Sequence, residues 1–215
     1  MPLSGLIVDW GGVLTIGMHE AMGSWVQDEA IDINAYISVM RDWLGPDYAV
    51  EAAFNPIHAL ERGEIEVPEF ETHLAEALTQ RTGQPIEADG LLNRMFRFFR
   101  HSPDRIALVR RAKEQGIRTA LLSNSWGNNY PQDLFDGMFD VVVISGEVGM
   151  RKPDAEIFHH TLEAIGLTAR ECVFVDDLLP NVRAARELGF VAVHHTEYAT
   201  TAAELDALFA RELSR

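Results

Sequence analysis

Hydrophobic positions divide the chain into two halves with different periodicities. A short apolar run, LIV, ends at Val8 and predicts one buried strand. From about residue 18 to residue 100 the apolar positions recur at helical spacing, and no convincing strand interrupts them. Two of these helices are expected to end at Gly45 and Gly83, because glycine readily adopts the left-handed conformation that terminates a helix.

Strand and helix patterns alternate after Ser102, which we expect to cap a helix that begins at Pro103 and stops at Gly116. The segments that follow are, in order, strands TALLS and VVVIS, helix AEIFHHTLEAIG, strand CVFVD, helix NVRAARELG and strand VAVH. Five strands with intervening helices predict an α/β fold with a doubly wound parallel sheet. The predicted domains are a core of residues 1–17 and 101–215 and a helical cap, 18–100, inserted after the first strand.

Composition narrows the choice of partners. The chain has 33 acidic and 18 basic residues among 215, a formal net charge of −15. A nucleic acid or an anionic membrane surface is therefore not an expected partner, because phosphate-backbone binding requires a basic face. The only cysteine, Cys172, lies in an apolar run, so no disulfide framework is expected. No signal peptide or membrane-spanning segment is apparent, which predicts a cytoplasmic protein.

Polar side chains directly follow three of the predicted strands. Asp9 follows LIV, Ser123 and Asn124 complete TALLSN, and Asp176 and Asp177 follow VFV. The carboxyl ends of parallel strands form the ligand crevice of an open α/β sheet. Each residue alone has a simpler reading, since aspartate, serine and asparagine are common in turns and helix caps. Their joint occurrence at strand ends favours a functional site.

A further segment, GMRKPD, contains Lys152 and lies in the chain between TALLSN and VFVDDLLPN. In this order the segments LIVDWGGVLT, TALLSN, GMRKPD and VFVDDLLPN resemble the motifs of the haloacid dehalogenase superfamily, subfamily IA. Most members of that superfamily are magnesium-dependent phosphatases with an aspartate nucleophile. The resemblance implies that Asp9 attacks phosphorus and forms an acyl-phosphate, which water later hydrolyses.

The same resemblance implies roles for the remaining motif residues. Phosphate would be bound by the Ser123 hydroxyl, the Asn124 backbone N–H and Lys152. Asn181 would orient the second aspartate of the pair or a metal-bound water. The implied Mg²⁺ ligands are Asp9, Asp176, Asp177 and the backbone carbonyl of Gly11, and a hard cation would also relieve repulsion among the three carboxylates.

Gly11 departs from the family pattern, because most phosphatases of this superfamily have a second aspartate there that acts as general acid and base. Haloacid dehalogenases also lack that aspartate, but they use no metal and replace the aspartate pair. Motif details resemble a branch that includes bacterial glucose 1-phosphate phosphatases and the N-terminal phosphatase domain of soluble epoxide hydrolases. We therefore expect a Mg²⁺-dependent phosphatase acting on a small phosphorylated metabolite, with sugar phosphates among the candidate substrates. A 2-haloacid dehalogenase and a catalytically weak phosphate-binding or regulatory protein remain alternatives, and the oligomeric state is left open.

Overall fold

A computed structural model describes residues 2–15, 17–45, 55–127 and 130–214. Five strands form one sheet in the order β3-β2-β1-β4-β5, and every neighbouring pair is parallel. The strands are β1 (Gly5–Val8), β2 (Arg118–Ser123), β3 (Val141–Ile144), β4 (Cys172–Asp176) and β5 (Val191–His194). The predicted α/β fold with a parallel sheet is confirmed.

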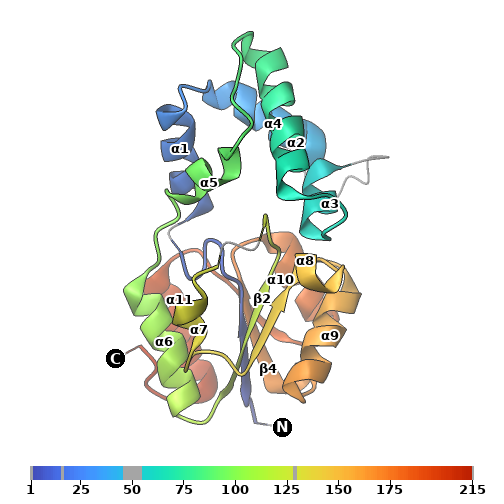
Figure 1. Cartoon of the computed structure of the whole chain (residues 1–215). Coiled ribbons are helices and arrows are strands. Elements are labelled where there is room, and N and C mark those ends of the chain that lie inside the picture. Colours follow the sequence, from blue (N-terminus) through green and yellow to red (C-terminus); the bar gives the residue numbers. More distant parts are fainter. Residues whose placement is uncertain (1, 16, 46–54, 128–129, 215) are drawn as a thin grey trace.

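The apolar runs are buried because helices cover both faces of the sheet (Figure 1). Along β1, Leu6 and Val8 belong to the same apolar cluster as α6 (Pro103–Glu114) and α11 (Tyr198–Phe209). Ile7 points to the opposite face, into the cluster formed with α9 (Ala155–Ile165) and α10 (Leu179–Glu187). This alternation follows from the two-residue period of a strand.

Shorter elements complete the core. They are α7 (Gln132–Phe135), α8 (Ser145–Val148) and a 3₁₀ turn, η1 (Ala169–Glu171). Ser102 occupies the predicted N-cap position before Pro103, but its side chain makes no capping hydrogen bond. The proline, whose ring fixes a helical φ, is therefore the stronger start signal for α6.

The predicted helical region forms a second layer with its own apolar core. Its helices are α1 (Met18–Asp28), α2 (Ile33–Leu44), α3 (Pro56–Glu61), α4 (Val67–Thr82) and α5 (Leu91–Phe96). Trp25 and Phe70 are fully buried at its centre. Gly83 ends α4 in the left-handed conformation, as predicted. Gly45 ends α2 with φ 69° and ψ 179°, a different positive-φ conformation from the predicted left-handed cap.

The chain passes between the two layers at two adjacent points. Thr15 and His101 pair there in an isolated antiparallel bridge. Figure 1 shows the five cap helices above the carboxyl-terminal edge of the sheet, and this arrangement puts the cap over the strand ends that carry the polar motifs. The domain limits 1–17 with 101–215 and 18–100 stay a prediction.

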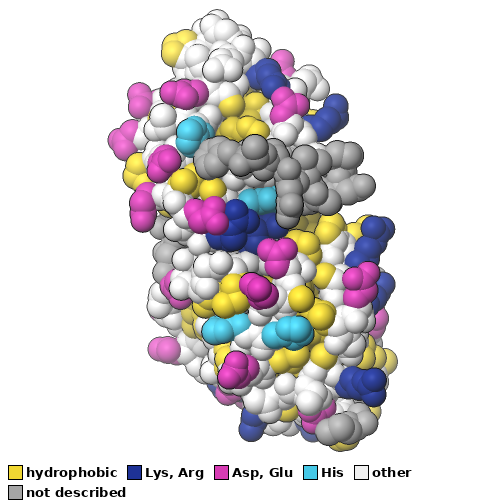
Figure 2. Space-filling model, turned by 90° about the vertical axis from the view of Figure 1, so that its right-hand side faces the viewer, with side chains coloured by type: hydrophobic (Ala, Val, Ile, Leu, Met, Phe, Trp, Pro, Cys, Tyr) yellow, Lys and Arg dark blue, Asp and Glu magenta, His cyan; other side chains and the backbone are white. Residues whose placement is uncertain are grey.

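The surface reflects the acidic composition. In Figure 2 acidic and basic side chains are both spread over cap and core, and one basic area near the boundary between them is flanked by acidic side chains. Within the described parts of the chain, no helix combines the length and apolarity needed to cross a membrane.

Candidate active site

Asp9, Ser123 and Asp176 are brought together by the register of the three central strands. Val8 is paired with Leu121 on one side and with Val175 on the other. The backbone N–H of Asp9 donates to the carbonyl of Val175 at 2.9 Å, which extends the ladder by one residue. All three polar side chains are buried. The sequence prediction that these residues converge agrees with this arrangement.

Lys152 lies between two of the carboxylates. Its Nζ is 2.8 Å from Oδ1 of Asp9 and 2.7 Å from Oδ2 of Asp176, and its side chain is 1% exposed. Burial alone would lower the pKa of Lys152, but Asp176 and Asp9 outweigh it and hold the pKa above its ordinary value. Burial also raises the pKa of Asp9 to about 6, against the opposing effect of Lys152. The lysine is thus a permanent positive charge beside the candidate nucleophile.

Asp177 completes a group of three carboxylates. Asp9, Asp176 and Asp177 each offer an oxygen, and these oxygens lie within 4.8 Å of one another. Burial, followed by repulsion from Asp9 and Asp176, raises the pKa of Asp177 to about 8. Its Oδ1 is buried and has no hydrogen-bond partner. A buried oxygen without a donor, in an all-oxygen ligand set, fits the coordination preference of a hard cation such as Mg²⁺.

The loop after Asp9 approaches Asp177 so closely that it requires glycine. Gly12 has φ +71°, and a Cβ there would lie 2.1 Å from Oδ2 of Asp177. The Gly12 N–H donates to the hydroxyl of Thr15 at 3.0 Å. Arg105 binds the other side of the loop, with Nη1 donating to the carbonyls of Gly12, Val13 and Thr15. Arg105 was not predicted from the sequence, because 90 to 93 residues separate it from the carbonyls that it binds.

Asn181 contacts the first aspartate of the pair and not the second, and its alternative role toward a metal-bound water stays a prediction. Its Nδ2 lies 3.1 Å from both carboxylate oxygens of Asp176. Asp176 also accepts from the N–H of Leu178 at 2.8 Å. With these donors and Lys152, both carboxylate oxygens of Asp176 already accept hydrogen bonds. Asp177 consequently has the less occupied carboxylate.

Ser123 and Asn124 have additional partners that the motifs did not reveal. The hydroxyl of Tyr130 donates to Oγ of Ser123 at 2.8 Å and so orients it. The Asn124 side chain forms a reciprocal pair with the Lys152 backbone: Nδ2 donates to the carbonyl at 2.9 Å, and Oδ1 accepts from the N–H at 2.8 Å. Asn124 therefore positions the lysine segment, besides offering its own predicted backbone N–H.

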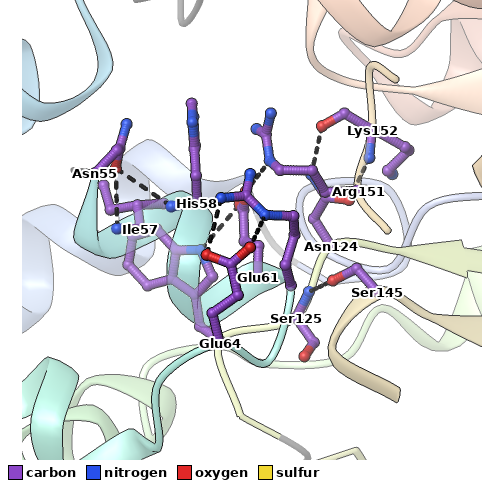
Figure 3. A network of polar contacts seen from close by, with 12 residues as sticks. Asn55, Ile57, His58, Glu61, Glu64, Asn124, Ser125, Ser145, Arg151 and Lys152 are labelled. Carbon is purple, nitrogen blue, oxygen red and sulfur yellow. Dashed lines mark hydrogen bonds and ion pairs between the residues drawn. The ribbon is translucent and has the colours of Figure 1, made fainter. Parts of the chain in front are cut away.

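A buried ion pair joins the cap to the core beside this segment. Oε2 of Glu61, on α3, accepts from Nε of Arg151 at 2.7 Å, and Oε1 accepts from the Trp126 indole at 3.2 Å. Figure 3 shows Glu61 and Arg151 pointing toward each other, with Lys152 and Asn124 alongside. Sequence analysis did not identify Glu61 or Arg151, since a charged pair from two distant segments has no local signal.

One cavity of about 1060 Å³ extends from the strand ends to the cap. Asp9, Ser123, Lys152 and Asp177 lie at its core end, while apolar side chains of α2 and α5 line its cap end. A volume of this size is at the upper end of the range for small-molecule sites. The described residues therefore place the Asp9 carboxylate, the buried ammonium of Lys152 and a cluster of carboxylate oxygens at the end of a substrate-sized cavity.

Residues 3–189 match the family model of the haloacid dehalogenase-like hydrolases. The chain belongs to this family. The match includes all four polar motifs and confirms the resemblance seen in the sequence. Membership makes the chain a hydrolase of this superfamily, while its substrate depends on what the cap and cavity accept.

Phosphatases are among the curated relatives, and two of them illustrate the similarity. The chain is 39% identical to a sesquiterpene phosphatase of Aspergillus oryzae over 110 residues, which are 47% of this chain and 54% of the relative. It is 35% identical to a phosphoserine phosphatase of Thermus thermophilus over 126 residues, 55% of this chain and 51% of the relative. In both cases the matched region spans about half the length of the relative.

Solved structures show the same fold. A family member from Bacteroides thetaiotaomicron, solved with magnesium and inorganic phosphate, has a TM-score of 0.64 and 18% identity, covering 93% of this chain and 98% of its own. An L-2-haloacid dehalogenase has a TM-score of 0.63 and 20% identity, covering 93% of this chain and 91% of its own. The fold is thus compatible with both phosphatase and dehalogenase chemistry, and only the residues of the site can distinguish the two.

Proposed function

We propose that this protein is a Mg²⁺-dependent phosphatase that hydrolyses small phosphate monoesters through an aspartyl-phosphate on Asp9. The observation that carries the proposal is the buried Oδ1 of Asp177, which lacks a partner inside a cluster of three carboxylates. The cation would be held by Asp9, Asp176, Asp177 and the backbone carbonyl of Gly11. When bound, it would neutralise charge on the carboxylates and on the phosphoryl group.

In the first step a carboxylate oxygen of Asp9 attacks phosphorus, and the bond from phosphorus to the ester oxygen breaks. The leaving alkoxide takes up one proton and departs as the alcohol. In the second step water attacks phosphorus of the acyl-phosphate, which releases inorganic phosphate and one proton and restores the Asp9 carboxylate. Splitting the displacement in this way is the advantage of covalent catalysis.

The phosphoryl oxygens would be bound by Lys152, the Ser123 hydroxyl and the Asn124 backbone N–H. Lys152 suits this role because its raised pKa keeps it charged and because Asp176 fixes its ammonium 2.7 Å away. Tyr130 holds the Ser123 hydroxyl in place. Preorganised donors of this kind stabilise developing charge without reorganising during the reaction.

The leaving oxygen has no side-chain acid at the family's usual position, since Gly11 occupies it. General acid catalysis typically contributes about 10²–10⁴-fold. Water or the substrate would then supply the proton, and esters of more acidic alcohols would react faster. A sugar 1-phosphate, as in the branch that the motifs resemble, has such a leaving group. The two phosphatase relatives described above are named for a sesquiterpene and for phosphoserine. They support the reaction class but do not specify the alcohol of the substrate.

The alternatives are weaker on the same geometry. In a dehalogenase the third carboxylate, Asp177, would have no role, because a halide can leave without a metal ion beside the nucleophile. A regulatory phosphate-binding protein would not require an oriented nucleophile, yet Asp9 is fixed by a backbone hydrogen bond at 2.9 Å and by Lys152 at 2.8 Å. Both alternatives stay open to experiment.

A metal-supplemented screen of phosphate monoesters and 2-haloacids tests the proposal, with the Asp9→Asn variant as the control. We expect phosphate release with Mg²⁺, none in excess chelator, and none from folded Asp9→Asn protein. Halide release in chelator would support the dehalogenase instead. Stoichiometric phosphate binding without turnover of any ester would support the regulatory protein.

A further inference from the structure

We propose that the preferred substrate is a phosphate monoester of a long, apolar alcohol, whose hydrocarbon chain occupies the cap end of the cavity. This inference rests on the proposed phosphatase function and names the substrate class of the same site. The phosphate would be bound at Asp9, Ser123 and Lys152, and the hydrocarbon would extend from there along α2 and α5.

The cap end of the cavity is lined mainly by hydrocarbon and aromatic side chains. Those that carry the argument are Met22, Tyr36, Ile37, Met40, Phe96 and Phe99. Met40, Phe96 and Phe99 are only partly buried by the cap core, so part of their surface is available to a ligand. Methionine adapts its shape easily to an irregular apolar ligand. Such a lining would bind a flexible hydrocarbon chain well.

The same lining offers little to a sugar. The Tyr36 hydroxyl already donates to the sulfur of Met22 at 3.3 Å. Among described residues, the charged cap side chains that line the cavity are Arg41, which is exposed, and Glu61, which is paired with Arg151. A hydroxylated substrate would therefore lose its hydrogen bonds to water without replacing most of them, which disfavours its binding.

The exposure of Ile37 adds to this indication. It is 41% exposed although it is a large aliphatic residue, and it lines the cavity. Ile33, one turn earlier on the same helix, is similarly exposed at 39% but does not line the cavity. An apolar substrate would cover Ile37 and leave Ile33 in solvent. This pair therefore provides a test variant and a matched control.

The experiment measures kcat/KM for straight-chain primary alkyl phosphates from ethyl to decyl, below their aggregation concentrations, with Mg²⁺. All these alcohols have nearly the same leaving-group acidity, so the series isolates the effect of chain length. We expect kcat/KM to rise about three- to fourfold per added methylene until the cavity is filled. In Ile37→Gln the decyl-to-ethyl ratio should fall several-fold, and in Ile33→Gln it should match the wild type.

A flat dependence on chain length, with hexose phosphates turned over faster than decyl phosphate, would overturn the substrate class while leaving the phosphatase intact. An equal loss in both variants would also overturn it. Calorimetric binding of decyl and ethyl phosphate to Asp9→Asn protein separates this inference from the proposed function. If Asp9→Asn protein binds decyl phosphate more tightly than ethyl phosphate but the wild type turns over neither ester, only the proposed phosphatase function is refuted. Equal affinities for the two esters would refute the binding of a hydrocarbon chain at the cap end of the cavity.

Discussion

Lys152 and Asp176 form a fully buried ion pair in which Nζ and Oδ2 lie 2.7 Å apart. Two further donors, the Asn181 amide and the Leu178 N–H, fix Asp176 on its other side. Asp176 is therefore fixed by its own hydrogen bonds, and it in turn fixes Lys152. The Lys152 ammonium lies 2.8 Å from Asp9. In this arrangement Asp176 positions the Lys152 ammonium, in addition to its proposed role as a metal ligand.

Lys152→Met should inactivate the protein and destabilise its metal-free form. Removing the ammonium leaves Asp9 and Asp176 buried without a counter-charge, and breaking a buried ion pair in this way costs about 3–5 kcal/mol. Chemical denaturation in chelator measures the loss. Lys113→Met is the control, because Lys113 forms a more exposed pair with Asp140 at 3.0 Å, worth about 1 kcal/mol or less. Equal effects of the two changes would contradict the assigned role.

Asp177→Ala should remove Mg²⁺ binding more severely than Asn181→Ala. Asp177 offers a buried oxygen with no partner, whereas Asn181 acts on Asp176, which Lys152 and the Leu178 N–H also hold in place. A bound ligand raises the melting temperature of the folded state, so we expect the Mg²⁺-dependent rise to vanish in Asp177→Ala and to persist, reduced, in Asn181→Ala. Loss of the rise in Asn181→Ala alone would show that the metal lies elsewhere.

The rate should depend steeply on leaving-group acidity because Gly11 provides no acid. Phenyl phosphates of similar size but graded phenol acidity isolate this effect from chain length. With the chemical step shown to be rate-limiting, we expect log kcat/KM to rise steeply as the phenol becomes more acidic. A flat dependence would mean that water, the substrate or a cap residue supplies the proton efficiently. Gly11→Asp should flatten the slope if the new carboxyl reaches the leaving oxygen.

Acid should destabilise the cap through His58. Burial, followed by Arg151 and Arg62, lowers the pKa of this histidine from 6.5 to about 4. Because the unfolded chain binds the proton more readily, this contribution to stability is complete above pH 6.5 and is lost as the pH falls toward 4. His58→Gln should therefore lose less stability than the wild type between pH 7 and 5. The same change at exposed His159 should reproduce the wild-type pH dependence.

The sequence predicted the parallel sheet well because buried strands and capped helices leave local patterns. Asp9, Ser123 and Asp176 could be predicted as neighbours for the same reason, since their positions at strand ends determine where they meet. Glu61, Arg105 and Tyr130 could not be found, because each acts on a residue brought near only by tertiary packing.

The contact of Asn181 shows a subtler limit. Its position four residues after Asp177 led to the second aspartate as the expected partner, whereas the structure gives Asp176, five residues before it. The choice is made by the direction of the first turn of α10 relative to the end of β4. The cap cavity likewise depends on how α2 and α5 face the core, which helical periodicity does not specify.

The stereochemical course at phosphorus distinguishes transfer through Asp9 from direct attack by water. A thiophosphate ester made chiral by oxygen isotopes would be hydrolysed in labelled water, and the configuration of the released thiophosphate would be determined. Transfer to Asp9 and then to water inverts phosphorus twice, so we expect net retention. Net inversion would mean that water attacks the ester directly, and it would contradict Asp9 as the nucleophile.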